Sequence, residues 1–541
     1  MAYPKANDQR IRLSNIYRGC RKYFVIQIFI ALSVLYIFYS INGGLIPKFL
    51  IPHMPFLNVG PDVNALLFFD VNNDASKISW ARATNDREKL ENAVHSDVHM
   101  IEGDVILQGQ GTESQKMIPV MAEPPQTESD LLLVDWLDKI KYKTNKGIKL
   151  DFSSIDAVEI SLQRLKEAHF QYPIKFPVWI HADVLEGPHG GKVRVDPSRF
   201  FQTLKRVFPK CTVSLGWTTG THTDLSQSAY TWDMVMDMYE LVKKWRIDDQ
   251  PIVFQVRLSL MHNSVPQLKW LCDNIAHSAL NVWHVKKDSV LNDDLMHIAY
   301  RFPPHAVFFD LNHAQYEALL YKYRHFSKEK ISHYVQKRDE VIFRPQAWLK
   351  MGFYIQKDSI LPSTEGIILT CPIVYIVTKS TYRPTTEVYI QGRVQFLNRK
   401  NREIESFHTG LNIYLRPTAY ANFDQIVGIR CFLGVGGEIE IVGSNLPDSI
   451  PNFRKTARIT PSSANCYRFQ ITDAGDKVIF QVSSLHDCIT LESVIQTEDM
   501  HLTLSADIPE KLSREPHPFI LRMEDNNREG VIDELSVKHK M

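Results

Sequence analysis

The feature that most constrains this chain is an uncharged apolar segment close to its N-terminus. Residues 23–41 contain no charged side chain, and twelve of these 19 residues are Val, Ile, Leu or Phe. A helix of about 20 apolar residues is long enough to cross the hydrocarbon core of a bilayer. A soluble amphipathic helix is not expected here, because the segment has no polar face. The sequence therefore predicts a transmembrane helix over 23–41.

The flanking residues predict how this helix is oriented. Residues 1–22 carry six basic side chains and one acidic side chain, so the positive-inside rule makes them a short cytoplasmic tail. The alternative is a cleaved signal peptide, whose apolar region is usually shorter and ends in small residues. Tyr36, Phe38 and Tyr39 close this segment instead. We expect an uncleaved signal anchor, a single-pass type II protein, and an ectodomain that is extracellular or luminal.

Beyond the anchor, residues 42–61 are rich in Pro and Gly and are expected to form a stem. Over 62–335, short apolar strands alternate with amphipathic helices. The predicted strands are 78–82, 99–107, 118–123, 147–152, 177–184, 212–218, 251–260, 279–285 and 306–311, and the predicted helices are 130–142, 154–169, 228–246 and 314–325. This alternation predicts an α/β fold, a TIM-like β/α barrel, with a doubly wound open sheet as the alternative.

The last third of the chain has a different pattern. Residues 340–510 contain strand-like runs with few helical stripes, which predicts a mainly antiparallel β domain, sandwich-like in form. Residues 511–541 are polar and are expected to form a loose tail. Cys20 lies beside the anchor, and six further cysteines follow it, whose pairing the sequence leaves open. A net charge of +1 gives no reason to expect a nucleic-acid partner.

Acidic side chains in two predicted strands suggest a metal site. Glu102 and Asp104 are two residues apart, so both side chains leave the same face of their strand, and Lys149 and Asp151 share a face in the same way. Glu102, Asp104 and Asp151 together offer the oxygen ligands that Mg²⁺ or Ca²⁺ prefers. The alternative is a metal-free cluster in which these acids pair with Lys149 or with surface lysines.

Other residues are candidates for the wall of a pocket. His181 and Asp183 share one face of strand 177–184, although a histidine in such a strand is more often a core residue with satisfied hydrogen bonds. Trp217 ends an apolar strand, where it either packs in the core or walls a pocket at the barrel mouth.

Six stretches of the chain resemble the menorin family and occur in that family's order over about residues 75 to 320. They are SWARATNDREKLENAV, HMIEGDVIL, PVMAEPPQTESD, NKGIKLDF, PVWIHADVLEGP and SLGWTTG. The menorin family resembles the glycerophosphodiester phosphodiesterase superfamily, whose members have a β/α-barrel fold. In that superfamily, two histidines act as general acid and base, and an E-x-D pair with a third acid binds a divalent cation.

The resemblance transfers to this chain only in part. It places the E-x-D pair on Glu102 and Asp104 and the third acid on Asp151, but the two histidine positions hold Arg82 and Glu123. Arginine does not deprotonate near neutral pH, so Arg82 cannot act as a base. General acid–base groups typically contribute 10²- to 10⁴-fold each to such a reaction. The histidine mechanism of the superfamily is therefore not expected here.

The two substitutions suggest a change of pairing at the barrel mouth. We expect Arg82 either to pair with Glu123 or to reach Glu102 and Asp104 in place of a cation. The alternative is that Arg82 and Glu123 are independent changes in a site that is no longer used. A lysine that the superfamily places two residues after the third acid falls on Ser153.

These features predict a non-catalytic cell-surface protein with cell-surface or extracellular protein partners. The resemblance implies this role, because menorin-family members are associated with extracellular adhesion complexes that pattern dendrites between skin and neurons. One alternative is a metal-dependent phosphodiesterase or lyase in which His95, His99 or His181 replaces the lost histidines. Another is a binding module for an anionic headgroup or a sulfated glycan, with Arg82 as the anion clamp.

Overall fold

A computed structural model of the chain describes residues 60–539. Within this range it leaves out 62, 144, 194, 221–227, 248, 286–300, 312–316, 318–347, 353–359, 363–365, 370–373, 385–386, 398–408, 420–424, 487, 489–500, 513–514 and 525–528. The predicted tail, the anchor, nearly all of the stem and most of the helix predicted at 314–325 lie outside the described residues. None of the helices in the described residues is both long and apolar enough to cross a membrane.

The first described part of the chain is built on a nearly closed parallel sheet. Its strands follow the order β1, β2, β4, β5, β6, β7, β8, β9, and β3 pairs with β2 in the antiparallel sense. Their bounds are β1 Trp80–Ala81, β2 Met100–Leu107, β3 Pro119–Met121, β4 Gly147–Phe152, β5 Val178–Glu186, β6 Thr212–Thr218, β7 Ile252–Arg257, β8 Ser278–Trp283 and β9 Val307–Asp310. All nine predicted strands are present, as the apolar runs indicated. Seven of the eight residues of β2 are buried, which is typical of a parallel sheet that is covered on both faces.

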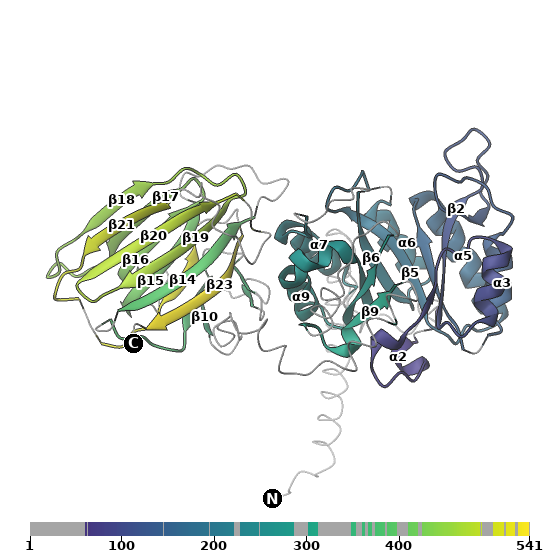
Figure 1. Cartoon of the computed structure of the whole chain (residues 1–541), viewed down its shortest axis with the longest axis horizontal. Coiled ribbons are helices and arrows are strands. Elements are labelled where there is room, and N and C mark those ends of the chain that lie inside the picture. The colour runs from purple at the N-terminus through teal and green to yellow at the C-terminus, as the bar shows by residue number, and fades with distance from the viewer. Residues whose placement is uncertain are drawn as a thin grey trace, which may run out of the picture. The chain divides into compact units, whose positions relative to one another are not determined.

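Helices cover the outside of this sheet in Figure 1. They are α2 Ala65–Phe68, η3 Ala75–Lys77, α3 Arg87–His95, α4 Leu133–Ile140, α5 Ile155–Gln171, α6 Pro197–Val207, α7 Trp232–Trp245, α8 Leu258–Met261, η4 His262–Ser264, α9 Val265–Asn274 and η5 Pro304–Ala306. Several begin at a side chain that accepts a backbone N–H of the first turn, such as Asp86 before α3 and Ser154 before α5. The helices predicted at 130–142, 154–169 and 228–246 correspond to α4, α5 and α7.

The segment from α2 to β1 covers one end of the barrel. Leu66, Ala75 and Ile78 pack in one buried cluster with Met100 and Val253, which lie at the amino ends of their strands. The carboxyl ends of the strands therefore lie at the other end of the barrel, where β/α barrels carry their functional residues.

The second described part consists of two antiparallel sheets of seven strands each. The first sheet has the order β10, β13, β22, β15, β16, β17, β18, and the second has the order β11, β12, β23, β14, β19, β20, β21 (Figure 1). Both sheets contribute to one hydrophobic core, for example through Ile390 of β14 and Ile413 of β15. The bounds are β10 Trp348–Gly352, β11 Ile360–Pro362, β12 Ile367–Leu369, β13 Val374–Thr378, β14 Val388–Phe396, β15 Gly410–Ala419, β16 Val427–Gly434, β17 Glu438–Ser444, β18 Arg454–Arg458, β19 Cys466–Asp473, β20 Lys477–Leu485, β21 His501–Asp507, β22 Ile520–Met523 and β23 Gly530–His539.

The prediction of a loose tail over 511–541 was wrong. Strand β22 lies between β13 and β15 in one sheet, and β23 lies between β12 and β14 in the other. The physical reason is a set of apolar side chains within this polar stretch. Leu521, Met523 and Ile532 are fully buried, so the burial of these side chains holds the segment in the core despite its polar composition.

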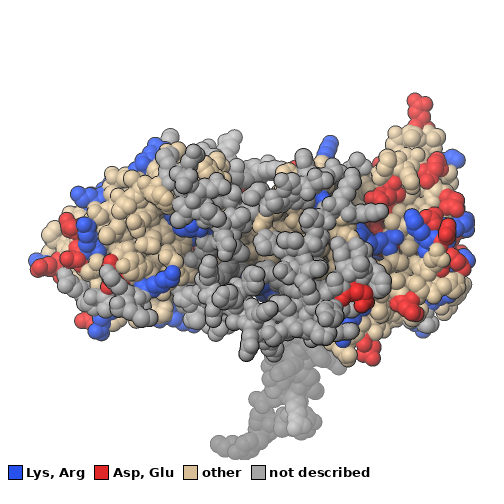
Figure 2. Space-filling model, viewed as in Figure 1, with Lys and Arg blue, Asp and Glu red and all other residues tan. Residues whose placement is uncertain are grey.

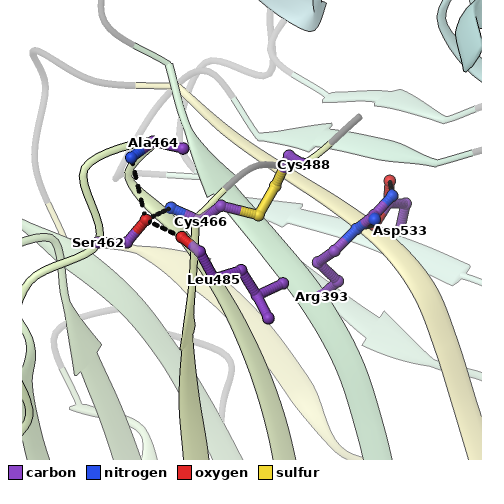
Figure 3. Close-up of a disulfide and its surroundings, with 7 residues drawn as sticks. All are labelled: Arg393, Ser462, Ala464, Cys466, Leu485, Cys488 and Asp533. Atoms are coloured by element: carbon purple, nitrogen blue, oxygen red, sulfur yellow. Dashed lines mark hydrogen bonds and ion pairs between the residues drawn. A yellow bond between two sulfur atoms is a disulfide. The ribbon is translucent and has the colours of Figure 1, made fainter. Parts of the chain in front are cut away.

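A disulfide joins Cys466 of β19 to Cys488, just beyond β20 (Figure 3). Beside it, Ser462 Oγ accepts from the Cys466 N–H at 3.0 Å and donates to the Leu485 carbonyl at 2.6 Å. These bonds fix the turn that precedes the bridge. Among the described cysteines, Cys211, Cys272 and Cys431 are free thiols.

Candidate functional site

The carboxyl ends of the barrel strands surround a cavity of about 810 Å³. It is lined by six acidic side chains and three basic ones among the described residues. These are Glu102, Asp104, Glu123, Asp151, Asp183 and Asp310, and Arg82, Lys149 and Lys192. Acidic side chains therefore outnumber basic ones in the lining of the cavity. On the outer face that Figure 2 shows, acidic and basic side chains are interspersed.

The three carboxylates predicted as metal ligands converge in this cavity. One oxygen each from Glu102, Asp104 and Asp151 lies within 4.8 Å of the other two. Strands β2 and β4 are adjacent and parallel, and their register places Asp104 opposite Asp151. The two-residue spacing of Glu102 and Asp104 brings both side chains to the inner face of β2.

Local hydrogen bonds fix the orientation of two of these acids. The Ala83 N–H donates to Glu102 Oε2 at 2.6 Å, and Ala83 has a left-handed backbone with φ of 48°. Asn85 Nδ2 donates to Asp104 Oδ2 at 2.7 Å. Each bond holds one carboxylate oxygen, so the turn after β1 positions both acids of the E-x-D pair.

The cavity gathers acidic groups whose pKa values are raised. Burial raises the pKa of Glu102 and raises the pKa of Asp104 well above its ordinary value, and the neighbouring carboxylates raise both further. Burial alone would lower the pKa of Lys149, but the charges of Asp151, Glu102 and Asp310 outweigh it and raise this pKa. Lys149 therefore stays charged, yet one ammonium group does not neutralise the surrounding carboxylates.

Lys149, two residues before Asp151 on β4, brings a positive charge into the cavity. Its Nζ lies 3.5 Å from Asp151 Oδ2. Residues two apart on a strand share a face, so a lysine two positions before the acid projects into the same cavity as one two positions after it. Ser153 also lines the cavity.

Arg82 forms an ion pair with Asp310 of β9, the last strand in the order of the sheet. Its Nε lies 3.3 Å from Asp310 Oδ1, and its Nη1 donates to the His284 carbonyl at 3.1 Å. The described ion pairs do not include the predicted pairing of Arg82 with Glu123, or with Glu102 and Asp104. Glu123 is exposed at the cavity rim. Arg82 pairs instead with Asp310, a buried acid at the end of β9.

His181 and Asp183 both line the cavity, as predicted. His181 is buried, and its Nε2 lies 3.7 Å from Asp151 Oδ2 and 3.5 Å from Asp183 Oδ1. Trp217, in contrast, does not line this cavity. Its ring packs against Tyr230 with centroids 5.0 Å apart, and its Nε1 donates to the Met234 carbonyl at 3.3 Å. Trp217 is therefore a packing residue rather than a pocket wall.

Sequence reasoning missed four polar residues of the barrel interior. Asp310 ends β9, and Ser214, Gln255 and Asn281 lie within β6, β7 and β8, each buried. Each is a polar residue whose two chain neighbours are apolar, and this pattern is a signal from which sequence reasoning could have found them. Burying such groups is unfavourable unless they are hydrogen-bonded or functional.

The carboxylates of Glu102, Asp104 and Asp151 fit a hard divalent cation. Three carboxylates supply oxygen ligands, and Mg²⁺ and Ca²⁺ prefer oxygen ligands over nitrogen or sulfur. Burial raises the pKa of Glu102 and Asp104, and neighbouring acids raise it further, so the ionised forms of both need charge compensation. A cation held by Glu102, Asp104 and Asp151 would supply that compensation, so the residues present fit the group.

Two family models match this chain. The menorin N-terminal domain matches residues 74–316 and the menorin C-terminal domain matches residues 358–536. Among curated proteins, human protein FAM151B is 39% identical over 238 residues, which are 44% of this chain and 83% of that protein. The first match covers the barrel and its cavity, and the second covers most of the two antiparallel sheets.

Solved structures give only weak similarities. A legume lectin-like domain from Entamoeba histolytica is 8% identical and covers 36% of this chain and 91% of that chain, with a TM-score of 0.27. A protein of unknown function from Saccharomyces cerevisiae is 11% identical and covers 36% and 98%, with a TM-score of 0.23. At these scores neither similarity supports a conclusion about this chain.

Proposed function

Since this chain belongs to the menorin family, we propose that it is a membrane-anchored extracellular protein whose barrel cavity binds a divalent cation. Its role is that of a non-catalytic binding component at the cell surface, with extracellular or cell-surface proteins as partners. The family association with dendrite and tissue patterning suits this role. In this proposal, the chain consists of a TIM-like barrel followed by a β sandwich, and the helix at 23–41 holds it to the bilayer.

One observation carries the cation site. The oxygens of Glu102, Asp104 and Asp151 lie within 4.8 Å of one another, while Arg82 is engaged with Asp310. Arginine therefore does not take the place of the cation between the first two acids. The Cys466–Cys488 disulfide supports an extracellular or luminal location of this part of the chain, because structural disulfides persist mainly in oxidising environments.

The same geometry argues against histidine-type phosphodiester cleavage. Arg82 occupies the first histidine position and stays charged near neutral pH, so it accepts no proton. Glu123 occupies the second position and is exposed at the rim. Neither side chain reproduces the paired acid and base that the superfamily mechanism needs.

Calorimetry of the full-length chain in nanodiscs tests the cation site. We expect Ca²⁺ or Mg²⁺ to bind the wild-type protein and not the Glu102→Gln/Asp104→Asn variant. An Asp130→Asn/Asp135→Asn variant is the matched control, because these two acids lie on the outside of the barrel beside Arg87. Equal binding by all three proteins, or binding by none, would reject the proposal.

A second candidate is a metal-dependent phosphodiesterase or lyase with rewired proton-transfer groups. The position of His181 favours it, because its Nε2 faces the cavity between Asp151 and Asp183. A bound divalent cation would supply Lewis-acid polarisation of a phosphoryl oxygen. Turnover of a phosphodiester by the cation-loaded chain, lost in His181→Ala, would favour this candidate over the non-catalytic one.

A further inference from the structure

A row of buried hydrogen bonds crosses the barrel interior and ends at His181. Asn281 Nδ2 donates to Gln255 Oε1 at 2.9 Å, and Gln255 Nε2 donates to Ser214 Oγ at 2.8 Å. Ser214 Oγ in turn lies 3.1 Å from His181 Nδ1. These residues come from the adjacent strands β8, β7, β6 and β5, and the first three are at most 3% exposed. We call these three side chains the relay.

The direction of the relay favours one tautomer of His181. Ser214 Oγ accepts from Gln255 Nε2 and has one hydrogen to donate. When it donates that hydrogen to His181 Nδ1, the ring hydrogen of the neutral imidazole lies on Nε2. The surroundings of Nε2, on the opposite side of the ring, favour the same tautomer. Nε2 faces the carboxylates of Asp151 and Asp183 at 3.7 and 3.5 Å, which favour an N–H over a lone pair at that position.

Core packing alone does not account for the relay. The three polar side chains of the relay and His181 are less favourable in a barrel interior than apolar residues of the same shape unless every polar group is satisfied. Within the described residues, Asn281 Oδ1 is buried without a hydrogen-bond partner. A relay that retains an unsatisfied amide oxygen suggests a function beyond stability.

We propose that Ser214, Gln255 and Asn281 are positioning residues, which hold the His181 Nε2–H toward Asp151 and so orient that carboxylate for the cation. This inference rests on the proposed cation site. A ligating carboxylate is commonly held by a donor behind it, and loss of such a donor typically weakens metal affinity by about 10- to 100-fold. Nε2 lies 3.7 Å from Asp151 Oδ2 and 3.5 Å from Asp183 Oδ1, so a small movement toward Asp151 completes the hydrogen bond.

Nitrogen NMR of the full-length chain with ¹⁵N-labelled histidine tests the tautomer directly. The resonances of His181 are identified by their loss in His181→Gln. At a pH where the ring is neutral, we expect the hydrogen on Nε2 in the wild type and a mixture of tautomers in Ser214→Ala. A hydrogen on Nδ1 in the wild type would overturn the relay whatever the cation does.

Calcium calorimetry on the same proteins tests the consequence. Ser214→Ala and Gln255→Met should each weaken binding by about 10- to 100-fold, and Ser214→Thr, which keeps the hydroxyl, should restore most of it. His181→Gln, which keeps a donor near the Nε2 position, should bind better than His181→Asn. Ser161→Ala is the matched control, because Ser161 is a fully buried serine of α5 outside the relay.

The outcomes separate this inference from the proposed function. Wild-type affinity in Ser214→Ala, with an altered tautomer, would overturn the positioning role and leave the cation site intact. Absence of calcium binding by the wild type would overturn the cation site and the positioning role together, while the tautomer measurement would still establish or reject the relay.

Discussion

Arg82 and Asp310 join the two ends of the parallel sheet, with Arg82 Nε 3.3 Å from Asp310 Oδ1. Arg82 follows β1 directly and Asp310 ends β9, the first and last strands in the order. The described residues of β1 and β9 share no ladder pairing. A side-chain ion pair thus bridges the gap in a barrel that is otherwise closed by strand pairing.

Removing Arg82 should destabilise the protein. In Arg82→Met, the buried Asp310 loses its ion-pair partner, although Lys149 remains near. Because the Arg82 side chain is 38% exposed, we expect a loss of about 1 to 3 kcal/mol rather than the larger effect of a fully buried pair. Chemical denaturation measures the loss. Arg87→Met is the control, since Arg87 makes an exposed ion pair and should lose at most about 1 kcal/mol. Equal losses of unfolding free energy in the two variants would show that the Arg82–Asp310 ion pair has no special role in stability.

The effect of a cation on thermal stability should depend on pH. Burial raises the pKa of Glu102 and Asp104 in the cation-free protein above their values in the unfolded chain. Their contribution to the free energy of unfolding is therefore fully present at low pH and is lost as the pH rises through the raised values. A cation offsets the repulsion between the ionised groups.

We therefore expect Ca²⁺ to raise the Tm more at about pH 8 than at about pH 5, where protons compete for the carboxylates. Thermal scans with calcium and with a chelator at both pH values measure this. The Glu102→Gln/Asp104→Asn variant should show no gain at either pH. A gain of the same size at both pH values would contradict the assignment of these acids as ligands.

Gly216 should be needed for the arrangement of His181 and Asp183. A Cβ at this position would lie 2.0 Å from Asp183 Oδ1 and 2.9 Å from His181 Cε1. Gly216→Ala should displace both side chains, cost about 1 to 3 kcal/mol and weaken calcium binding. Gly191→Ala is the control, because Gly191 lines the same cavity but its Cβ would meet nothing within 4 Å. Unchanged calcium affinity in Gly216→Ala would contradict a role for this strand in the site.

The disulfide should be present in protein isolated from the membrane fraction. Peptide mapping without reductant should recover Cys466 linked to Cys488, and Cys466→Ser/Cys488→Ser should lose about 3 kcal/mol. Cys431→Ser tests a buried free thiol in the same part of the chain. Reduced Cys466 and Cys488 in the native protein would argue against an extracellular or luminal ectodomain.

Much of the barrel was predictable because its strands are short apolar runs of regular spacing. In such strands, residues two apart share a face, which was enough to bring Glu102 and Asp104 together on β2. The same periodicity placed Asp151 beside Lys149 on one face of β4, and the family resemblance pointed to the same third acid. His181 and Asp183 followed from the same periodicity, and all five line the cavity.

The remaining features depend on which strands meet, and a single sequence does not specify this. Asp310 lies 228 positions after Arg82 in the chain, and only the near-closure of the sheet brings the two together. The relay likewise depends on the register of β5 to β8. Trp217 was a candidate for the pocket wall that the structure places elsewhere. A tryptophan at a strand end can face either the cavity or the outer helices, and here it contacts α7.

The most direct test of this account is a crystal structure of the chain grown with Mn²⁺, an anomalous scatterer that takes oxygen ligands in place of Mg²⁺ or Ca²⁺. The account predicts a single strong anomalous peak in the barrel cavity, bonded to carboxylate oxygens of Glu102, Asp104 and Asp151, with Arg82 still paired to Asp310. A cavity without such a peak, or a structure in which Arg82 or Lys149 occupies the space between the three carboxylates, would contradict it.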